Sequence, residues 1–201
     1  NSLVQYEEDG AILGYVMYRT RAHDTLGVPD GTVAVTELLA ETDAAYSALW
    51  QFVFGIDLIA TIEAPYRRVN EPLGWMLTDP RHLHRAVYDT LWLRLVELPA
   101  ALAGRCYLSE GSLVISVSDQ FCPWNNGSYL LEGGPSGATC TPTTRTADVE
   151  LNANDLGAAY LGGVRFETLA RANRVTGSAQ ALRLADRMFQ WDCLPWELEV
   201  F

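Results

Sequence analysis

Three prolines divide the chain into two stretches of different pattern: Pro65, Pro72 and Pro80 stand close together near its middle. Proline lacks a backbone N–H and disfavours helical geometry in the residue before it, so helices and strands rarely continue through such a segment. The 201 residues are 49% hydrophobic, which is enough to bury a core and excludes wholesale disorder. We therefore expect two folded units, with a boundary near residues 82–88.

The stretch before the prolines mixes strand and helix patterns. Residues 14–19 and 32–39 are predicted strands, because apolar and β-branched residues dominate them. Thr42 and its acidic neighbours are N-cap candidates, and the apolar positions that follow recur at helical spacing as far as Phe54. Residues 56–64 are predicted to form a further strand. This order predicts a unit in which strands and a helix pack together.

After the prolines, strand patterns come first and helix patterns second, which is typical of an α+β fold. The expected strands cover residues 91–95, 112–118, 129–131, 138–144 and 148–151, with a hairpin turn at residues 123–127. The expected helices cover residues 97–104, 154–161, 166–173 and 178–189.

The charge balance restricts the partners of the chain. Its 14 basic residues are all arginine and face 25 acidic residues, for a formal charge of −11. An acidic surface repels phosphate backbones, so a nucleic-acid partner is not expected. The same charge favours a cationic or amine-bearing partner. Because the sequence has no lysine, Schiff-base chemistry and lysine nucleophiles are excluded within it.

The cysteines indicate free thiols rather than a zinc site or a disulfide scaffold, because their spacing is wide and irregular. They are Cys106, Cys122, Cys140 and Cys193. No apolar run approaches the roughly 20 residues that span a bilayer, and no basic-then-apolar segment opens the sequence. We expect a cytoplasmic protein without a membrane span, secretion being left open.

Familiar catalytic motifs are missing from the sequence. His82 and His84 have no third metal ligand nearby, and no serine-nucleophile elbow, P-loop or dinucleotide fingerprint is present. Residues 174–179 fit a loose R-x-x-G-x-A pattern with which acetyltransferases hold a pyrophosphate. The preceding residues are helical in pattern, so we interpret this segment as a turn between helices, with Ser178 as N-cap.

The last residues alternate apolar and acidic side chains, which is unusual for a chain end. If this tail docks, it carries the α-carboxylate of Phe201 into a protein environment. That group has a reference pKa of about 3.5, and desolvation would raise the pKa and make the carboxylate a usable base. Together with Glu197 and Glu199 it would form a site for an amine. The alternative is a strand that closes a sheet edge, with no role for the terminal charge.

Several segments, in this order, resemble the C-terminal half of the Eis (enhanced intracellular survival) family of N-acetyltransferases. The resembling segments are GYVMYR, VTELLAETDAAYSALWQFVFGID, EPLGWMLTDPR, DTLWLRLVELPAALAGRCY, TCTPT, DVELNANDLGAAYLGGVRFETLARANRV and the terminal Phe201.

The resemblance implies a domain organisation. Residues 1–86 would be the rear part of the second, non-catalytic GNAT-like domain, which is mixed α/β. Residues 87–201 would be a sterol-carrier-protein-like α+β domain with the C-terminal tail. The family binds acetyl-CoA, and places its tyrosine general acid, in a first GNAT domain. The resemblance therefore implies that this N-terminal half is missing here and that the chain alone is inactive.

The resemblance also implies a site and a substrate class. The family acetylates primary amines of aminoglycosides and, in some members, lysines, with the terminal carboxylate as base. This role falls to Phe201, and Asp89 would line the amine pocket. Family members can carry an acid at the penultimate position, where this chain has Val200; Glu199 would face the opposite side of a strand.

Two other functions remain open at this point. Sterol-carrier-like domains elsewhere hold lipids, and the apolar segments LGAAYLGG and ALRLADRMF could line a tunnel or fill a core. The family also assembles as hexamers, so the chain could be an oligomerisation scaffold with Trp50, Trp75 or Trp196 in interfaces.

Overall fold

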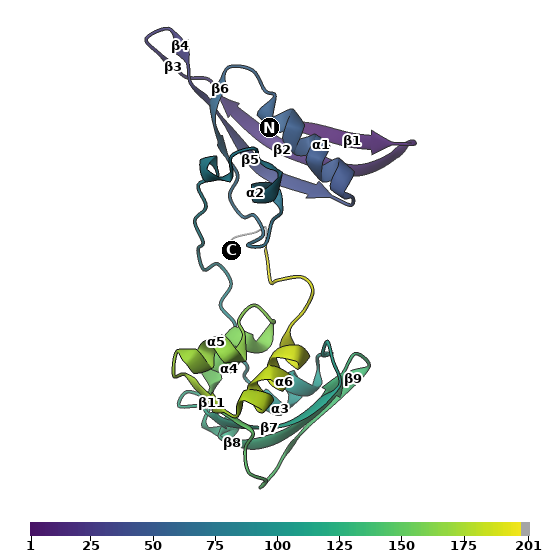
Figure 1. Cartoon of the computed structure of the whole chain (residues 1–201), viewed down its shortest axis with the longest axis vertical. Coiled ribbons are helices and arrows are strands. Elements are labelled where there is room, and N and C mark those ends of the chain that lie inside the picture. Colours follow the sequence, from purple (N-terminus) through teal and green to yellow (C-terminus); the bar gives the residue numbers. More distant parts are fainter. Residues whose placement is uncertain (198–201) are drawn as a thin grey trace. The chain divides into compact units, whose positions relative to one another are not determined.

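The computed structural model describes residues 1–197 of the chain. The contacts divide these residues into two compact units, residues 1–71 and 72–197, and each is described by itself (Figure 1). Within the second unit, residues 83–97 contain neither helix nor strand. The predicted boundary near residues 82–88 overlaps this stretch and stays a prediction.

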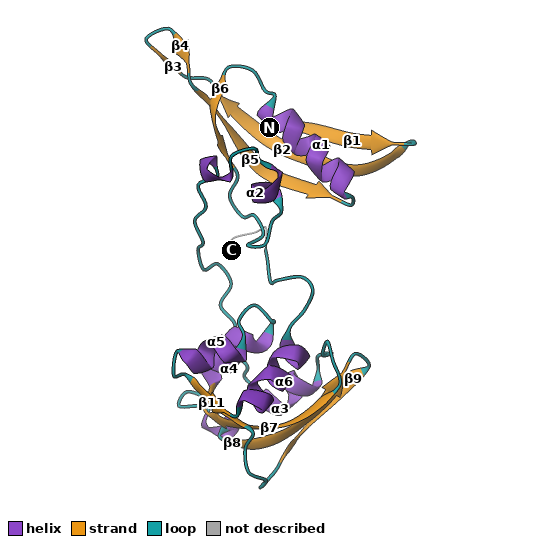
Figure 2. Cartoon of the chain, viewed as in Figure 1, coloured by secondary structure: helices purple, strands orange, loops and turns teal. Residues whose placement is uncertain are grey.

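The first unit is a four-stranded sheet with one helix against it (Figure 2). The strand order is β1-β2-β5-β6, and β5 and β6 are parallel and joined through α1. The elements are β1 (Ser2–Glu8), β2 (Ala11–Arg21), β5 (Gly31–Ala40), α1 (Asp43–Phe54) and β6 (Ile59–Glu63), with a small ribbon of β3 (Asp24–Thr25) and β4 (Val28–Pro29).

Helix α1 has the bounds that its sequence predicts. The Thr42 side chain accepts a hydrogen bond from the backbone N–H of Ala45 at 3.1 Å, which caps the first turn. The face buried against the sheet carries Leu49, Trp50 and Val53. Strand β1 was not among the predicted elements, because its residues are mostly polar and exposed, so hydrophobic periodicity does not reveal it.

The second unit is a five-stranded sheet with its longer helices on one face (Figure 1). The strand order is β11-β10-β7-β8-β9, and only the β10–β7 pair is parallel. The strands are β7 (Gly111–Ser118), β8 (Gly127–Gly134), β9 (Gly137–Pro142), β10 (Val149–Asn152) and β11 (Val175–Gly177). The helices are α2 (Leu73–Met76), α3 (Leu98–Ala103), α4 (Ala153–Tyr160), α5 (Phe166–Arg171) and α6 (Ala179–Phe189), with 3-10 turns at Pro80–His82 and Pro123–Asn125.

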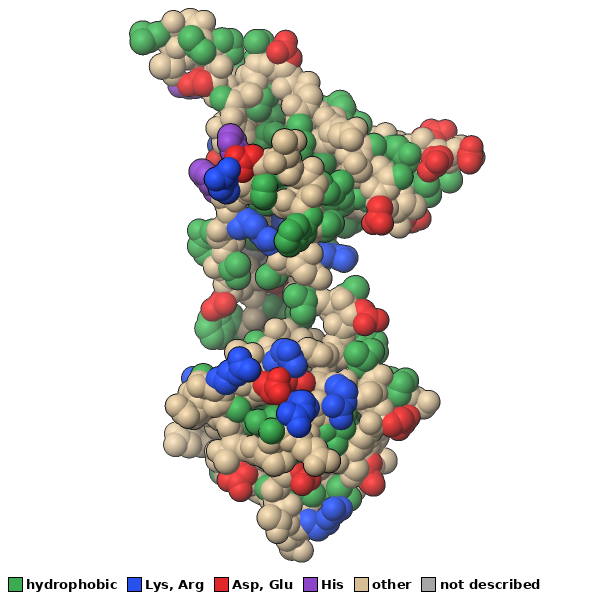
Figure 3. All heavy atoms as spheres, viewed as in Figure 1, with side chains coloured by type: hydrophobic (Ala, Val, Ile, Leu, Met, Phe, Trp, Pro, Cys, Tyr) green, Lys and Arg blue, Asp and Glu red, His purple; other side chains and the backbone are tan. Residues whose placement is uncertain are grey.

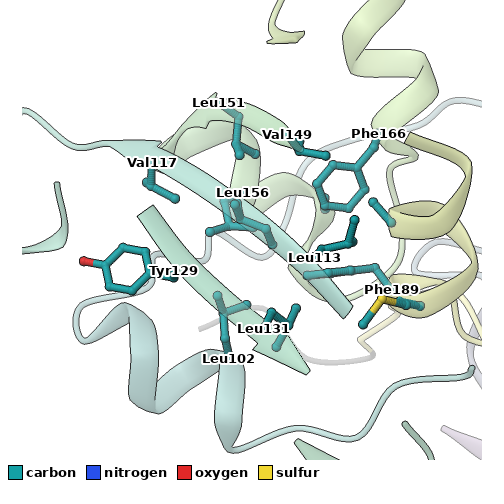
Figure 4. Packing of buried hydrophobic residues seen from close by; sticks show 14 of the residues in the cluster. Leu102, Leu113, Val117, Tyr129, Leu131, Val149, Leu151, Leu156, Phe166 and Phe189 are labelled. Carbon is teal, nitrogen blue, oxygen red and sulfur yellow. The ribbon is translucent and has the colours of Figure 1, made fainter. Parts of the chain in front are cut away.

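The core of this unit lies between the sheet and helices α3, α4, α5 and α6 (Figure 4). The rings of Phe166 and Phe189 meet edge to face, with centroids 4.9 Å apart. Leu156 and Met188 are fully buried in the same cluster. Helices α4 and α6 therefore direct most of the apolar side chains named in the tunnel hypothesis into the core, whereas Leu161 is exposed.

One predicted strand of this unit is wrong. Residues 91–95 form no strand, because no neighbouring strand pairs with them and Leu91 and Trp92 are exposed. The predicted hairpin is confirmed, since β7 and β8 pair antiparallel; its connection contains a 3-10 turn at Pro123–Asn125, and Gly127 already begins β8. The predicted N-cap Ser178 is confirmed, since its side chain caps α6, whereas α4 begins one residue earlier than predicted and is capped by Asn152.

Candidate functional site

Asp89 lies in the irregular stretch of residues 83–97, and its side chain is exposed. Its neighbours Tyr88 and Trp92 are also exposed, at 80% and 84% of their surfaces. A carboxylate attracts an ammonium group, and aromatic faces add a cation–π contribution. The family resemblance predicts Asp89 alone; the two aromatic residues on either side of it are visible in the sequence but are not part of that prediction.

The other two predicted site residues, Glu199 and Phe201, lie outside the described residues. The structure therefore neither brings them to Asp89 nor separates them from it, and their roles stay predictions. The chain leading to them is described as far as Glu197, which is partly buried.

A buried polar cluster holds the end of the segment that carries Asp89. Asn125 is 1% exposed, and its side-chain oxygen accepts the backbone N–H of Leu98 at 3.1 Å. Its amide group donates to the carbonyl of Val96 and to the carboxylate of Asp119, both at 3.1 Å. Trp124 donates its indole N–H to the same Val96 carbonyl at 2.9 Å. The β7–β8 connection thus fixes where residues 83–97 enter α3.

Asp119 is the charged member of this cluster. Burial opposes its ionisation, but hydrogen bonds from the backbone N–H of Cys122, the Asn125 amide and the backbone N–H of Phe121 hold its pKa below the ordinary value. Arg94, which lies in the same segment as Asp89, forms an ion pair with Asp119. Sequence reasoning could not find this cluster, because its members are far apart in the chain.

In the first unit, strand β5 leads directly into the N-terminus of α1. A helix N-terminus that follows a strand is a common binding site for a pyrophosphate. The residues there do not fit a pyrophosphate. Thr42 already accepts a first-turn N–H, and Glu41 and Asp43 add negative charge beside it. This junction is therefore not where acetyl-CoA would bind through its pyrophosphate.

Residues 174–179, the other pyrophosphate candidate, form part of the fold. Val175–Gly177 is the short strand β11 rather than a turn between two helices, which corrects the sequence interpretation. A Cβ at Gly177 would lie 2.8 Å from the carbonyl oxygen of Asp148. The glycine is thus explained by the close approach of β11 to its neighbour.

A surface pocket of about 370 Å³ lies at the ends of α4 and α6. Its lining residues are Arg105, Cys106, Tyr160, Leu161, Trp191, Cys193 and Pro195. The guanidinium of Arg105 lies over the rings of Tyr107, Tyr160 and Phe189, at 4.6 to 5.3 Å from their centroids. Desolvation by burial lowers the pKa of this arginine. Sequence reasoning did not find this pocket.

Among residues 1–197, no group of three or more His, Cys, Asp or Glu side chains is arranged to hold a metal ion. His82 lies 3.6 Å from a carboxylate oxygen of Asp79. Within the same described range, no helix has the length and apolar character needed to cross a membrane.

Comparison with known proteins identifies two domains. The acetyltransferase (GNAT) domain family matches residues 2–95, and the sterol carrier protein domain family matches residues 98–197. N-acetyltransferase Eis of Mycobacterium tuberculosis is 38% identical over 185 residues, covering 89% of this chain and 43% of that protein. An uncharacterised N-acetyltransferase of Streptomyces avermitilis is 39% identical over 191 residues, covering 94% and 47%.

Solved structures agree with these matches. The crystal structure of Eis1 from Mycobacterium abscessus superimposes with a TM-score of 0.78 at 35% identity, covering 94% of this chain and 48% of that one. A GCN5-related N-acetyltransferase from Kribbella flavida gives a TM-score of 0.67 at 28% identity, covering 94% and 46%. The chain spans about half the length of the curated relatives it matches.

These matches correct one expectation from the sequence. Residues 1–86 were expected to be only the rear part of a GNAT-like domain, with the acetyl-CoA-binding domain missing from the chain. The GNAT match instead extends over residues 2–95 and includes β1, whose polar residues had concealed it. The chain therefore carries an acetyltransferase (GNAT) domain followed by a sterol carrier protein domain, and its homologues are Eis-like N-acetyltransferases.

Proposed function

We propose that the chain is part of an acetyl-CoA-dependent N-acetyltransferase that acts on a primary amine of a cationic molecule, either aminoglycoside-like or lysine-like. The observation that carries this proposal is the 38% identity with an Eis N-acetyltransferase across 89% of the chain. The two domain matches support it, because they follow one another along the chain with little between them.

The chemistry requires a base and an anionic site for the substrate. An amine is mostly protonated near neutral pH and must lose a proton before it can attack a carbonyl carbon. Acetyl-CoA supplies the acetyl group. In our proposal the terminal carboxylate of Phe201 accepts this proton, directly or through water, and Asp89 and Glu199 hold the ammonium groups. The exposed rings of Tyr88 and Trp92 beside Asp89 support a cation site there.

The net charge supports the same substrate class. At −11, the chain attracts a polycation before contact is made. Salt screens this attraction, with a Debye length of about 8 Å at physiological ionic strength. The KM for a polycationic amine should therefore rise with added salt, while the KM for a neutral monoamine of similar size should change little.

The proposal is tested by adding two glycines after Phe201 in the full-length protein. The addition places the terminal carboxylate two residues further along the chain and changes no side chain. We expect the rate of acetyl transfer to fall by about 100-fold or more, the usual contribution of a general base. A protein with two extra glycines at its N-terminus is the control. Acetylation at the unmodified rate by the C-terminally extended protein would refute the role of the carboxylate.

The two other functions have less support. A lipid tunnel between α4 and α6 is opposed by the packing of their apolar faces into the core, although this packing does not fill the surface pocket at their ends. We propose a homo-oligomer, a hexamer by the family resemblance. Trp75, at 94% exposed, suits an interface, whereas Trp50 is 2% exposed and does not. Sedimentation of the full-length protein as a stable monomer would refute the assembly.

A further inference from the structure

Two exposed cysteines line the same pocket in the sterol carrier unit. Cys106 and Cys193 are both free and exposed, and both border the pocket of about 370 Å³ described above. They are separated by most of the unit along the sequence, so only the fold places them at one site. Nothing in the acetyl-transfer proposal uses either thiol.

Two hydrogen bonds connect the residues around Cys106 to the end of α6, which precedes Cys193. The backbone N–H of Leu108 donates to the carbonyl of Met188 at 2.9 Å. Arg105 donates a guanidinium N–H to the carbonyl of Phe189 at 3.1 Å. Cys106 follows Arg105 directly, and Cys193 comes four residues after Phe189, a stretch that reaches at most about 14 Å when extended. These contacts join the backbone near Cys106 to the C-terminal end of α6, from which the segment with Cys193 continues.

The segment that carries Cys193 has room to adjust. Residues 190–197 contain neither helix nor strand. They contact the end of α4, where a Cβ at Gly163 would lie 3.3 Å from the ring of Pro195. A disulfide needs Cα atoms within about 7 Å, so in our proposal this irregular segment shifts to bring Cys193 to Cys106 across the pocket that both residues line.

The other two cysteines differ from this pair, because they are buried and should react slowly. Cys122 and Cys140 are buried, and burial raises the pKa of the Cys140 thiol to about 11. The thiolate is the reactive form, so a buried thiol with a raised pKa reacts slowly. The reactive thiols should therefore be confined to the pocket.

We propose that Cys106 and Cys193 form a dithiol site that hydrogen peroxide oxidises to an intramolecular disulfide. Two S–H bonds break and one S–S bond forms; the two protons and two electrons pass to the peroxide, which is reduced to two molecules of water. In a reducing compartment such a bond is transient and reversible by thiols.

The disulfide would restrain the start of the C-terminal tail. Cys193 lies only a few residues before the segment that ends at Phe201. Tying Cys193 to Cys106 would limit how the tail can be placed and so change the rate of amine acetylation. This effect on the rate rests on the proposed function, whereas formation of the disulfide does not.

The test is to treat the full-length protein with hydrogen peroxide, block free thiols with iodoacetamide and map the peptides by mass spectrometry. We expect a peptide pair joined through Cys106 and Cys193, lost after dithiothreitol and absent from Cys106→Ser and Cys193→Ser variants. Cys122 and Cys140 should be alkylated only after denaturation. Circular dichroism of the two variants controls for folding.

The outcomes separate the two proposals. Independent oxidation of each thiol without a joined peptide, or joined peptides only between molecules, would overturn the dithiol site. If the disulfide forms, the acetylation rate of the oxidised protein should differ at least twofold from that of the reduced protein, and Cys106→Ser should abolish this difference. A disulfide that forms without changing the rate would leave the site standing and refute its link to the tail.

Discussion

Replacing Asn125 with alanine tests how much its side chain contributes to holding residues 83–97 in the fold. The side chain is 1% exposed and makes hydrogen bonds with the N–H of Leu98, the carbonyl of Val96 and the carboxylate of Asp119, each at 3.1 Å. Each such bond contributes about 1 kcal/mol net, and unpaired buried partners raise the cost. We therefore expect Asn125→Ala to lower the free energy of unfolding by about 3 kcal/mol.

Equilibrium urea denaturation followed by circular dichroism measures this loss. Gln120→Ala is the matched control, because Gln120 lies in the same connection and is exposed, and it should change stability by less than about 0.5 kcal/mol. If Asp89 binds the amine, Asn125→Ala should also raise the KM for the amine more than it lowers kcat. A loss of stability below about 1 kcal/mol would show that the cluster does not hold the segment.

Three further predictions concern single groups. Thr42→Ala removes the cap on the N–H of Ala45 and should cost about 1 kcal/mol, whereas Thr42→Ser should be close to neutral by thermal denaturation. Leu156→Ala, at a fully buried position, should cost about 2–5 kcal/mol, and no loss in urea denaturation would contradict the packed core. Because the folded pKa of Asp119 lies below its unfolded value, its contribution is present above that unfolded value and is lost as the pH falls through the folded pKa. Asp119→Asn should therefore flatten the acid side of a stability–pH curve, and an unchanged curve would argue against this role.

The sequence predicted best what local interactions decide. Thr42 and Ser178 cap their helices as expected, because a cap needs only a side chain and an N–H three residues on. Strand β1 was missed since backbone pairing with β2, rather than apolar side chains, places it in the sheet. Residues 91–95 were wrongly assigned as a strand for the converse reason: an apolar run cannot form a ladder without a neighbouring strand.

Less of the candidate site than of the fold could be predicted from the sequence. Asp89 was named through a family resemblance, and the exposure of its aromatic neighbours Tyr88 and Trp92 is known only from the structure. The Asn125 cluster and the pocket with two thiols join residues that are distant in the chain. No motif spacing marks such a group, because the fold rather than the local sequence brings its members together.

The anchoring of residues 83–97 has a consequence for how substrate preference can change. The contacts of Arg94 and Val96 with the β7–β8 connection fix one end of the segment, a few residues beyond Asp89. A substitution in that connection would displace the carboxylate without altering it. If Asp89 binds the amine, related enzymes can acquire new amine preferences through residues that never touch the substrate, and alignments of pocket residues alone would not reveal the cause.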